Sequence, residues 1–405
     1  MDLDRDGVEA RSVKLCAIGD VALSGAVATA IRTDGPGTAL DGLRGVLAGA
    51  DCVFANLESP FVPAETPADG WDRAALVAGL DLAPALAGID VCNLAANHVL
   101  DGGARGLEAT RAVLDRLGIA HVGAGTSRAE AWAPRIVERG GLRLGFLAWQ
   151  EDCTYTVGAS APGPALIDPP AMRAAVADLA AQVDAVVVSL HADLEFVETP
   201  APWRRDLAHD LIAAGARLVL GTHPHVPQGV EACGRGLIAH SLGNAVFDVA
   251  HPYMRANGPD TAWSFVLEVD LDGDGVRSWR QHPFAIGDRG CGILMAGSAA
   301  DRAAAELDRR NRLLADPAVL RANWRRLCLV RLQGLIDAVA GLRAEDVIEH
   351  HAWILGRVHE HRRWFDEVAA MADEAYARRP LVRREDRRPS WATEAALATR
   401  SPGWP

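Results

Sequence analysis

The sequence lacks several features that would assign the chain to particular protein classes. It has no cationic excess, because 41 Lys and Arg stand against 53 Asp and Glu, for a net charge of −12. Nucleic acids and anionic membranes select basic surfaces, so we expect neither as a partner. No apolar run reaches the length of a transmembrane helix, so no membrane-spanning segment is predicted.

Cysteine is scarce and unpatterned. The seven cysteines are odd in number, show no Cys-x-x-Cys spacing and partly lie in apolar runs, where a thiol behaves as a small hydrophobe. The N-terminal tail, 1–12, is acidic and has no apolar core, which predicts neither a signal peptide nor an anchor. We therefore expect a cytoplasmic protein in a reducing environment.

The chain does contain enough apolar sequence for a large core. It has 405 residues, of which 49% are hydrophobic. From 13 to 290, short apolar runs alternate with segments of helical period, which predicts an α/β layered domain. Strands are predicted at 13–19, 51–56, 89–95, 142–149, 184–190, 216–221 and 237–242, and helices at 104–117, 172–182 and 203–214.

The runs 263–271 and 276–284 alternate like an antiparallel hairpin, joined by a turn rich in Asp and Gly. The turn also opens like a calcium-binding loop, but Gln281 stands where such a loop has Glu. The hairpin is therefore the preferred interpretation.

Residues 298–378 are rich in Ala, Arg, Glu and Leu with helical period, which predicts a helical appendage that could form a dimer surface. An inner stripe is predicted at Val347, His351, Ile354, Val358 and Phe365. Four histidines occupy different faces of this region and are interpreted as surface groups: His350, His351, His359 and His361. Residues 379–405 are predicted to be an irregular tail.

The pentapeptide Gly221-Thr222-His223-Pro224-His225 follows a buried run and carries two imidazoles two residues apart. Both can face one cleft, which is a metal-ligand pattern, although a histidine is often only a satisfied polar group. Other predicted strands also end in ligand-type residues: Asp20, Asn56 with Glu58, Asn97 with His98, and His191. This mixed set of nitrogen and oxygen atoms suits Mn, Fe, Zn, Mg or Ca.

At these residues the chain resembles the CapA family of capsule and poly-γ-glutamate biosynthesis, a branch of the calcineurin-like metallophosphoesterase fold. The resemblance covers about 13–285 and rests on seven stretches: Ile18 to Val21, Ala55 to Pro60, Leu94 to Gly103, Val122 to Gly125, Ser189 to His191, Gly221 to His225 and Ser241 to Asn244. It implies a layered α/β sandwich, a divalent metal and no organic cofactor.

The resemblance also assigns roles to residues. It implies that Glu58 is a metal-bridging carboxylate, that Asn97, His191 and His223 complete one metal site, and that Asp20 and His225 form the other. His98 matches the position of a catalytic imidazole beside the metals. Asp101 is placed to accept a hydrogen bond from it.

Two departures from the family pattern affect this assignment. Ala22 stands where the parent enzymes carry His, so one tightly held metal is expected, with His223 a firmer ligand than His225. The strand-end His191 is followed by Ala192-Asp193-Leu194-Glu195 rather than Trp-Gly. Asp193 and Glu195 are therefore candidate catalytic carboxylates, or else part of a solvated loop.

Three functions remain open at this point. The chain resembles CapA-like epimerases that invert a Cα centre in ribosomal lasso-peptide precursors, with His98 and Glu195 or Asp193 as the two bases and a peptide as substrate. An alternative is a CapA-type metallophosphoesterase or metallohydrolase linked to capsule or poly-γ-glutamate metabolism, in which His98 protonates the leaving group. A metal-bearing interaction protein without activity is the third.

Segments 158–170 and 250–263 are long enough to cover the strand ends, or they are plain surface loops. Trp149, Trp203 and Trp263 are candidates to flank the cleft or to lie in the core.

Overall fold

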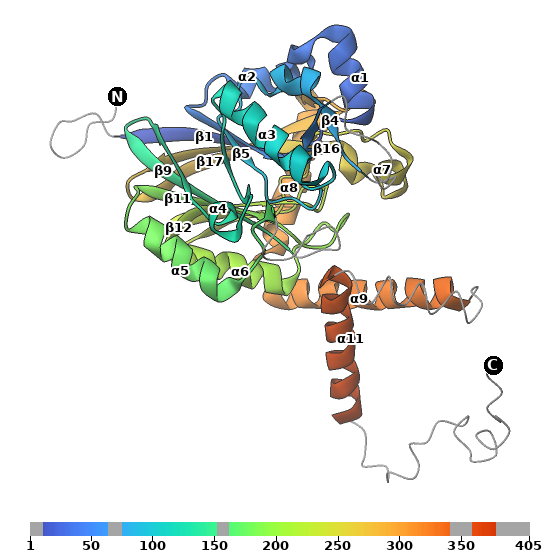
Figure 1. The fold of residues 1–405 in the computed structure, drawn as a ribbon. Coiled ribbons are helices and arrows are strands. Elements are labelled where there is room, and N and C mark those ends of the chain that lie inside the picture. Colours follow the sequence, from blue (N-terminus) through green and yellow to red (C-terminus); the bar gives the residue numbers. More distant parts are fainter. Residues whose placement is uncertain (1–10, 64–74, 152–161, 341–358, 378–405) are drawn as a thin grey trace, which may run out of the picture.

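A computed structural model describes residues 11–63, 75–151, 162–340 and 359–377. Two β-sheets lie face to face with helices on their outer sides, as Figure 1 shows. The predicted α/β layered architecture of a metallophosphoesterase sandwich is confirmed. The seven predicted strands and the three predicted helices are all present, with ends shifted by a few residues.

The first sheet has the order β18-β17-β16-β1-β2-β5-β6, and β15 pairs with the end of β1. Strands β1, β2, β5 and β6 run parallel, whereas β16 to β18 extend the sheet in antiparallel fashion. Its strands are β1 (Ser12–Val21), β2 (Cys52–Leu57), β5 (Val91–Asn93), β6 (Ala120–Val122), β15 (Asn244–Val246), β16 (Trp263–Asp272), β17 (Gly275–Ile286) and β18 (Gly292–Leu294).

The second sheet has the order β13-β14-β12-β11-β9-β8, and its four central strands are parallel. Its strands are β8 (Arg135–Arg139), β9 (Leu142–Gln150), β11 (Ala185–His191), β12 (Ala216–Thr222), β13 (Val230–Cys233) and β14 (Gly236–Ala239). Two small pairs lie apart from the main sheets: β3 (Phe61–Val62) with β4 (Ala78–Gly79), and β7 (Ala124–Gly125) with β10 (Gly163–Pro164).

Apolar side chains from both sheets meet in the central core. Phe54 of β2 stacks on Phe146 of β9 with ring centroids 6.1 Å apart. Leu15, Val187 and Leu218 belong to the same buried cluster. Burial of each such side chain contributes roughly 1.5–3 kcal/mol to folding. The core therefore fixes the two sheets against each other, and with them the polar residues at the strand ends.

Helices cover the outer faces of both sheets. The helix α3 (Gly103–Leu117) buries Leu107, Thr110, Val113 and Leu114 as predicted, whereas Leu117 is 42% exposed because the helix ends there at a left-handed Gly118. The remaining helices of the sandwich are α1 (Gly25–Asp34), α2 (Arg44–Leu47), α4 (Arg128–Ala131), α5 (Pro169–Ala180), α6 (Pro202–Ala213) and α7 (Pro252–Ala256). Short 3-10 turns complete it: η1 (Pro36–Ala39), η2 (Asp41–Leu43), η3 (Leu80–Leu86) and η4 (Pro259–Ala262).

The predicted hairpin is confirmed, since β16 and β17 pair in antiparallel register. Asp272 Oδ1 accepts hydrogen bonds from the backbone N–H groups of Asp274 and Gly275, at 2.7 and 3.1 Å. Gly275 has φ of 137°, which only glycine adopts without strain. The alternative of a calcium loop is wrong, because these residues form the turn between two strands.

The C-terminal region contains α8 (Gly297–Leu313), α9 (Pro317–Ala340) and α11 (His359–Ala377). The first of these helices packs on the sandwich, and its Leu307 belongs to the central core. Trp324 and Cys328 of α9 pack with Trp364 of α11 and with Leu194 of the loop after β11. Figure 1 shows that α9 and α11 extend beyond the sandwich.

Some predictions for this region concern residues outside those described. Four of the five residues of the predicted stripe, Val347, His351, Ile354 and Val358, lie there together with His350. The fifth, Phe365, is described and packs against the cluster of Trp324, Cys328 and Trp364. The dimer surface stays a prediction. Within the described part of the chain, no helix is both long and apolar enough to cross a membrane.

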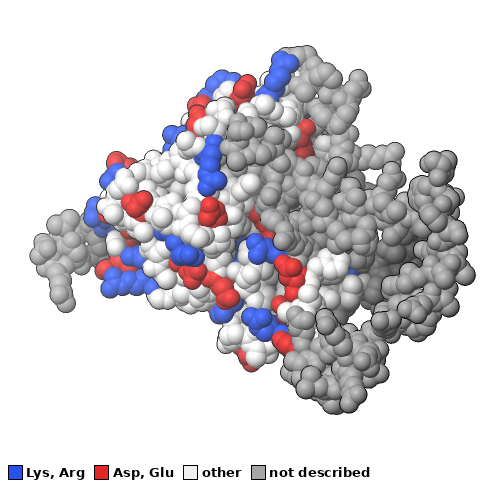
Figure 2. All heavy atoms as spheres, turned by 60° about the horizontal axis from the view of Figure 1, so that its bottom comes forward, with Lys and Arg blue, Asp and Glu red and all other residues white. Residues whose placement is uncertain are grey.

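The surface carries charges of both signs in close mixture. Figure 2 shows blue and red side chains interspersed over the described residues of one face, with no continuous basic area there. For example, Nη1 of Arg173 in α5 lies 3.2 Å from Oδ2 of Asp210 in α6. Such exposed pairs contribute little to stability, about 0–1 kcal/mol each.

Candidate metal centre

Ligand-type side chains from both sheets meet at the carboxyl ends of the parallel strands. In the first sheet, Asp20 at the end of β1 is in register with Asn56 of β2. In the second, His191 at the end of β11 is in register with Thr222 of β12. In open α/β sheets this edge is where ligands bind. The core contact between the sheets therefore creates a polar cluster that neither sheet forms alone.

Glu58, which directly follows β2, is the most unusual group in the cluster. It is 0% exposed, and neither carboxylate oxygen has a hydrogen-bond partner among the described residues. Its Oε1 lies 4.0 Å from His191 Nε2 and 3.8 Å from His225 Nε2. Burial, together with the charges of nearby carboxylates, raises the pKa of Glu58 well above its ordinary value.

A buried carboxylate without partners is costly unless a cation compensates it. Carboxylate oxygen and imidazole nitrogen are the ligands of divalent metals such as Mn, Fe and Zn. The residues around Glu58 therefore fit a divalent metal ion.

Asp20 is equally buried but has partners. Its Oδ1 accepts a hydrogen bond of 2.7 Å from Asn56 Nδ2, and its Oδ2 accepts one of 3.3 Å from the backbone N–H of His223. Asn93 Nδ2 donates in turn to Asn56 Oδ1 at 2.7 Å, which fixes the orientation of that amide. Burial raises the pKa of Asp20 to about 6, although His225 and Asn56 oppose the shift.

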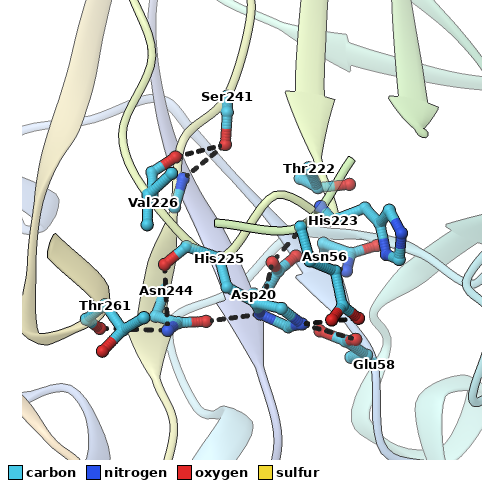
Figure 3. Close-up of polar contacts among 12 residues, drawn as sticks. Asp20, Asn56, Glu58, Thr222, His223, His225, Val226, Ser241, Asn244 and Thr261 are labelled. Atoms are coloured by element: carbon cyan, nitrogen blue, oxygen red, sulfur yellow. Dashed lines mark hydrogen bonds and ion pairs between the residues drawn. The ribbon is translucent and has the colours of Figure 1, made fainter. Parts of the chain in front are cut away.

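His225 is held so that one nitrogen faces the carboxylates. Asn244 Nδ2 donates to the carbonyls of His225 and Thr261, which leaves Asn244 Oδ1 to accept from His225 Nδ1 at 2.9 Å. The Nε2 lone pair is then available toward Glu58, as Figure 3 shows. Histidine ligands commonly donate their other N–H in this way.

His191 and His223 form the opposite side of the cluster, with ring centroids 4.7 Å apart. His191 Nε2 contacts Asn97 Oδ1 at 2.8 Å, and its Nδ1 contacts Thr222 Oγ1 at 3.0 Å. His223 Nδ1 is buried without a hydrogen-bond partner among the described residues. Burial lowers the pKa of His191 well below its usual value and that of His223 to about 4, so both are neutral at pH 7, as metal ligands must be.

Backbone strain is concentrated at this cluster. Among the described residues, four that are not glycine have positive φ: Asp193 at 98°, Phe196 at 64°, His223 at 93° and His225 at 58°. Each such conformation costs on the order of 1–3 kcal/mol and is typical of functional sites. The turn through Pro224 therefore orients both imidazoles at the expense of local backbone energy.

Two triads of ligand-type residues result, and within each triad the ligand atoms lie within 4.8 Å of one another. One contains Asp20, Glu58 and His225, and the other contains Glu195, His223 and His225. The expectation that His223 is a firmer ligand than His225 is therefore not supported. His225 belongs to both triads, because Asn244 directs its Nε2 between them.

His98 and Asp101 lie beside this cluster of ligand-type residues. His98 Nδ1 contacts Asp101 Oδ2 at 2.7 Å, as predicted, and Asp101 also accepts a hydrogen bond from the backbone N–H of Leu76. His98 and Asn97 line a cavity of about 520 Å³ together with Glu195 and His225. Its other lining residues are Ser24, Gly25, Ala75, Leu76, Phe247, Asp248, His251, Tyr253 and Met254.

The two carboxylates of the loop after β11 differ in their surroundings. Both oxygens of Asp193 accept backbone hydrogen bonds of 2.8 Å, from Leu194 and Ala201. Asp193 therefore stabilises the loop and does not line the cavity, so its predicted role as a base is not supported. Glu195 does line the cavity, and its Oε2 accepts a hydrogen bond of 2.6 Å from the Tyr253 hydroxyl.

Burial alone would raise the pKa of Glu195. The nearby His225 and His223 and the Tyr253 hydrogen bond outweigh that effect, so its pKa lies below the ordinary value.

Some residues of the site have no clear signal in the sequence. Tyr253 reaches the cavity from α7, which lies in the segment 250–263 considered as a possible cover. The other such segment, 158–170, lies partly outside the described residues, and its remainder contains β10 and the start of α5. None of Trp149, Trp203 and Trp263 lines the cavity. Trp149 is fully buried against Trp132, so the core interpretation is correct for it.

Comparison with known proteins identifies the family. Residues 14–249 match the family described as bacterial capsule synthesis protein PGA_cap. The chain belongs to the PGA_cap family. The resemblance to CapA that the motifs predicted is thereby confirmed.

Among the PGA_cap relatives, the capsule biosynthesis protein CapA of Bacillus anthracis is 32% identical over 170 residues, which are 40% of this chain and 41% of that protein. The PGA biosynthesis protein CapA of Bacillus subtilis (strain 168) is 30% identical over 161 residues, covering 39% and 42%. The chain spans less than half the length of either relative. A crystal structure of a hypothetical protein from Thermus thermophilus covers 67% of this chain and 99% of its own, with 18% identity and a TM-score of 0.42.

Proposed function

We propose that this chain is a metal-dependent hydrolase of the metallophosphoesterase type whose substrate belongs to capsule or poly-γ-glutamate metabolism. One observation carries the proposal. Glu58 Oε1 lies between His191 and His225, about equally far from both, so one carboxylate faces two sets of ligands. Membership of the PGA_cap family supports the class of substrate.

Each of the two ligand sets combines residues from both sheets, because Asn97 follows β5 of the first sheet and His225 follows β12 of the second. Asp20 and His225 are on one side of Glu58, and Asn97, His191 and His223 are on the other. A divalent ion held there would lower the pKa of a bound water and neutralise charge on the substrate. The missing imidazole at Ala22 makes the side of Asp20 the weaker of the two.

His98 is the group of this chain that is placed to move a proton. Asp101 holds its Nδ1, which fixes the ring so that Nε2 is the atom that would protonate a leaving group. His98 lines the same cavity as Asn97 and His225, so a substrate in that cavity reaches both the imidazole and the metal ligands.

A second candidate is the epimerisation of a Cα centre in a ribosomal lasso-peptide precursor. It is favoured by the presence of Glu195 and His98 in one cavity, since inversion needs one group to remove a proton and another to return it. The incomplete ligand set at Ala22 also weakens the case for a two-metal hydrolase.

One experiment separates these functions. The purified protein, loaded with Mn²⁺, is incubated in D₂O with phosphoesters, γ-glutamyl peptides and linear precursor-like peptides, and the products are analysed by mass spectrometry. Release of phosphate or of a cleaved fragment supports the hydrolase. Uptake of one deuteron at Cα without loss of mass would overturn it in favour of the epimerase. Mn²⁺ binding with neither product would overturn both and favour an interaction protein.

A further inference from the structure

The metal centre lacks one ligand that the family pattern places near the end of β1. Ala22 occupies that position, is 0% exposed and offers no ligand atom, while its backbone N–H donates to Val246 at 2.8 Å. On the Asp20 side of the centre, the described His, Cys, Asp and Glu residues form one triad of ligand atoms with Asp20, which is completed by Glu58 and His225. A divalent ion bound there by three residues would need further ligands from water or from another part of the chain.

Glu195 brings a carboxylate from the second sheet to the other triad, which shares His225 with the Asp20 side. Its Oε1 lies 4.0 Å from His225 Nε2, and its ligand atom, like that of His223, lies within 4.8 Å of the others in their triad. Two ligands on opposite sides of one ion are about 4 Å apart, since each bond is about 2.0–2.2 Å. The ligand atoms of the three side chains are therefore about as far apart as ligands around one metal ion.

The surroundings of Glu195 hold it in this orientation. Its Oε2 is occupied by the Tyr253 hydroxyl, so Oε1 is the oxygen directed at His225. The backbone of the next residue, Phe196, donates to the carbonyl of Pro224 at 2.8 Å, and its ring stacks on His225 at 5.9 Å. The loop that carries Glu195 is thus attached directly to the turn that carries the two imidazoles.

The ring of His223 is a second, independent indication that a metal ion binds here. Its ring is in the same triad, and its Nδ1 is buried with no hydrogen-bond partner among the described residues. A neutral imidazole whose nitrogen is buried and unpaired is stabilised when a metal binds it. Glu195 and His223 therefore supply complementary ligands around the same His225.

We propose that Glu195 is a metal ligand, which together with His223 and His225 holds an ion beside the Asp20 side that Ala22 leaves short of a ligand. This inference rests on the metal dependence of the proposed function. It assigns Glu195 to the ion rather than to proton transfer, and so leaves His98 as the proton-transfer group of the cavity.

Metal binding by Glu195→Gln tests the assignment, because the substitution keeps the shape of the side chain. Metal-free protein is titrated with Mn²⁺ by calorimetry and with Co²⁺ by visible absorption, which reports the ligand set. We expect the Kd for Mn²⁺ to rise by at least about tenfold and the Co²⁺ spectrum to change. Glu198→Gln is the matched control, since it removes the same charge three residues later from an exposed side chain paired with Arg309, and should change neither.

The outcomes are distinguishable. If Glu195→Gln binds Mn²⁺ as the unaltered protein does, with the same Co²⁺ spectrum, the assignment is wrong even if turnover is lost, and Glu195 is then a base. If the unaltered protein binds neither ion, the proposed function fails as well. Tyr253→Phe retains the carboxylate but releases Oε2, and serves as a second variant should Glu195→Gln prove unstable without metal. A raised Kd in Tyr253→Phe supports the assignment, and an unchanged Kd contradicts it.

Discussion

Glu58→Gln should separate the metal affinity of the protein from its folding stability. The substitution keeps the shape of the side chain and removes a negative charge from a carboxylate that is 0% exposed and has no hydrogen-bond partner among the described residues. In the metal-free protein this charge is destabilising, because burial and neighbouring acids raise its pKa. We therefore expect the metal-free variant to be more stable than the unaltered protein.

The equally buried Asp20 shows how large such an effect is for one carboxylate of this cluster. Its pKa rises from 3.8 to about 6, which corresponds to about 3 kcal/mol of lost stability when it is fully ionised. For an acid with a raised folded-state pKa, the loss begins above the unfolded-state pKa and grows with pH. We thus expect Glu58→Gln to stabilise the metal-free protein at pH 8 and to do so much less at pH 5, because the pKa of Glu58 is raised.

The assay is urea unfolding of the metal-free and the Mn²⁺-loaded protein at both pH values. At 100 times its Kd, Mn²⁺ should stabilise the unaltered protein by about 2.7 kcal/mol and the variant by far less. Glu198→Gln, which removes an exposed charge, should behave like the unaltered protein. The reasoning is refuted if metal-free Glu58→Gln is less stable at pH 8, or if Mn²⁺ stabilises it fully.

Three further predictions concern other parts of the chain. His98→Ala should lower kcat by about 10²–10⁴-fold and leave the amount of bound Mn²⁺, measured by elemental analysis, unchanged. A loss of metal in this variant would contradict the role of His98 in proton transfer. Glu231→Gln should make the free energy of unfolding depend less on pH in the acid range. His240, Arg205 and His209 hold the pKa of Glu231 at about 2 despite burial, so its contribution is present above pH 4.5 and is lost as the pH falls toward 2. After allowance for solvent screening, Glu231 contributes about 1–2 kcal/mol to the free energy of unfolding. Unfolding of the variant and the unaltered protein at pH 3 and pH 7 measures this contribution. Phe146→Ala should lower the free energy of unfolding in urea by about 3–5 kcal/mol, because Phe146 stacks on Phe54 between the sheets. A decrease below about 1 kcal/mol would show that this contact is not central to the core.

The fold could be predicted because hydrophobic periodicity determines which runs become buried strands. The continuous apolar run at 184–190 became β11, and the alternating runs at 263–271 and 276–284 became a hairpin. The ends of elements were less predictable. Leu117 fits the apolar stripe of α3, yet Gly118 ends the helix and leaves Leu117 exposed.

The candidate metal ligands could be found from the sequence because they follow strands whose ends must converge. The different roles of Asp193 and Glu195 could not. They lie two residues apart in one loop, yet Asp193, which has φ of 98°, directs its carboxylate at backbone N–H groups rather than at the cavity. Asn244 lay in a recognised motif, but its effect on the His225 nitrogen depends on carbonyls brought together by the fold.

The contact between the C-terminal helices and the loop after β11 has a consequence for how the protein is made. Arg331 of α9 donates to the carbonyl of Glu195, 136 residues earlier, and Trp364 of α11 packs in one cluster with Leu194. In a chain emerging from the ribosome, the last strand of the sheets, which ends at Leu294, precedes α9 and α11. We therefore expect a nascent chain to form most of the candidate metal centre early, and to complete the packing around the loop that carries Glu195 only after α9 and α11 have been synthesised.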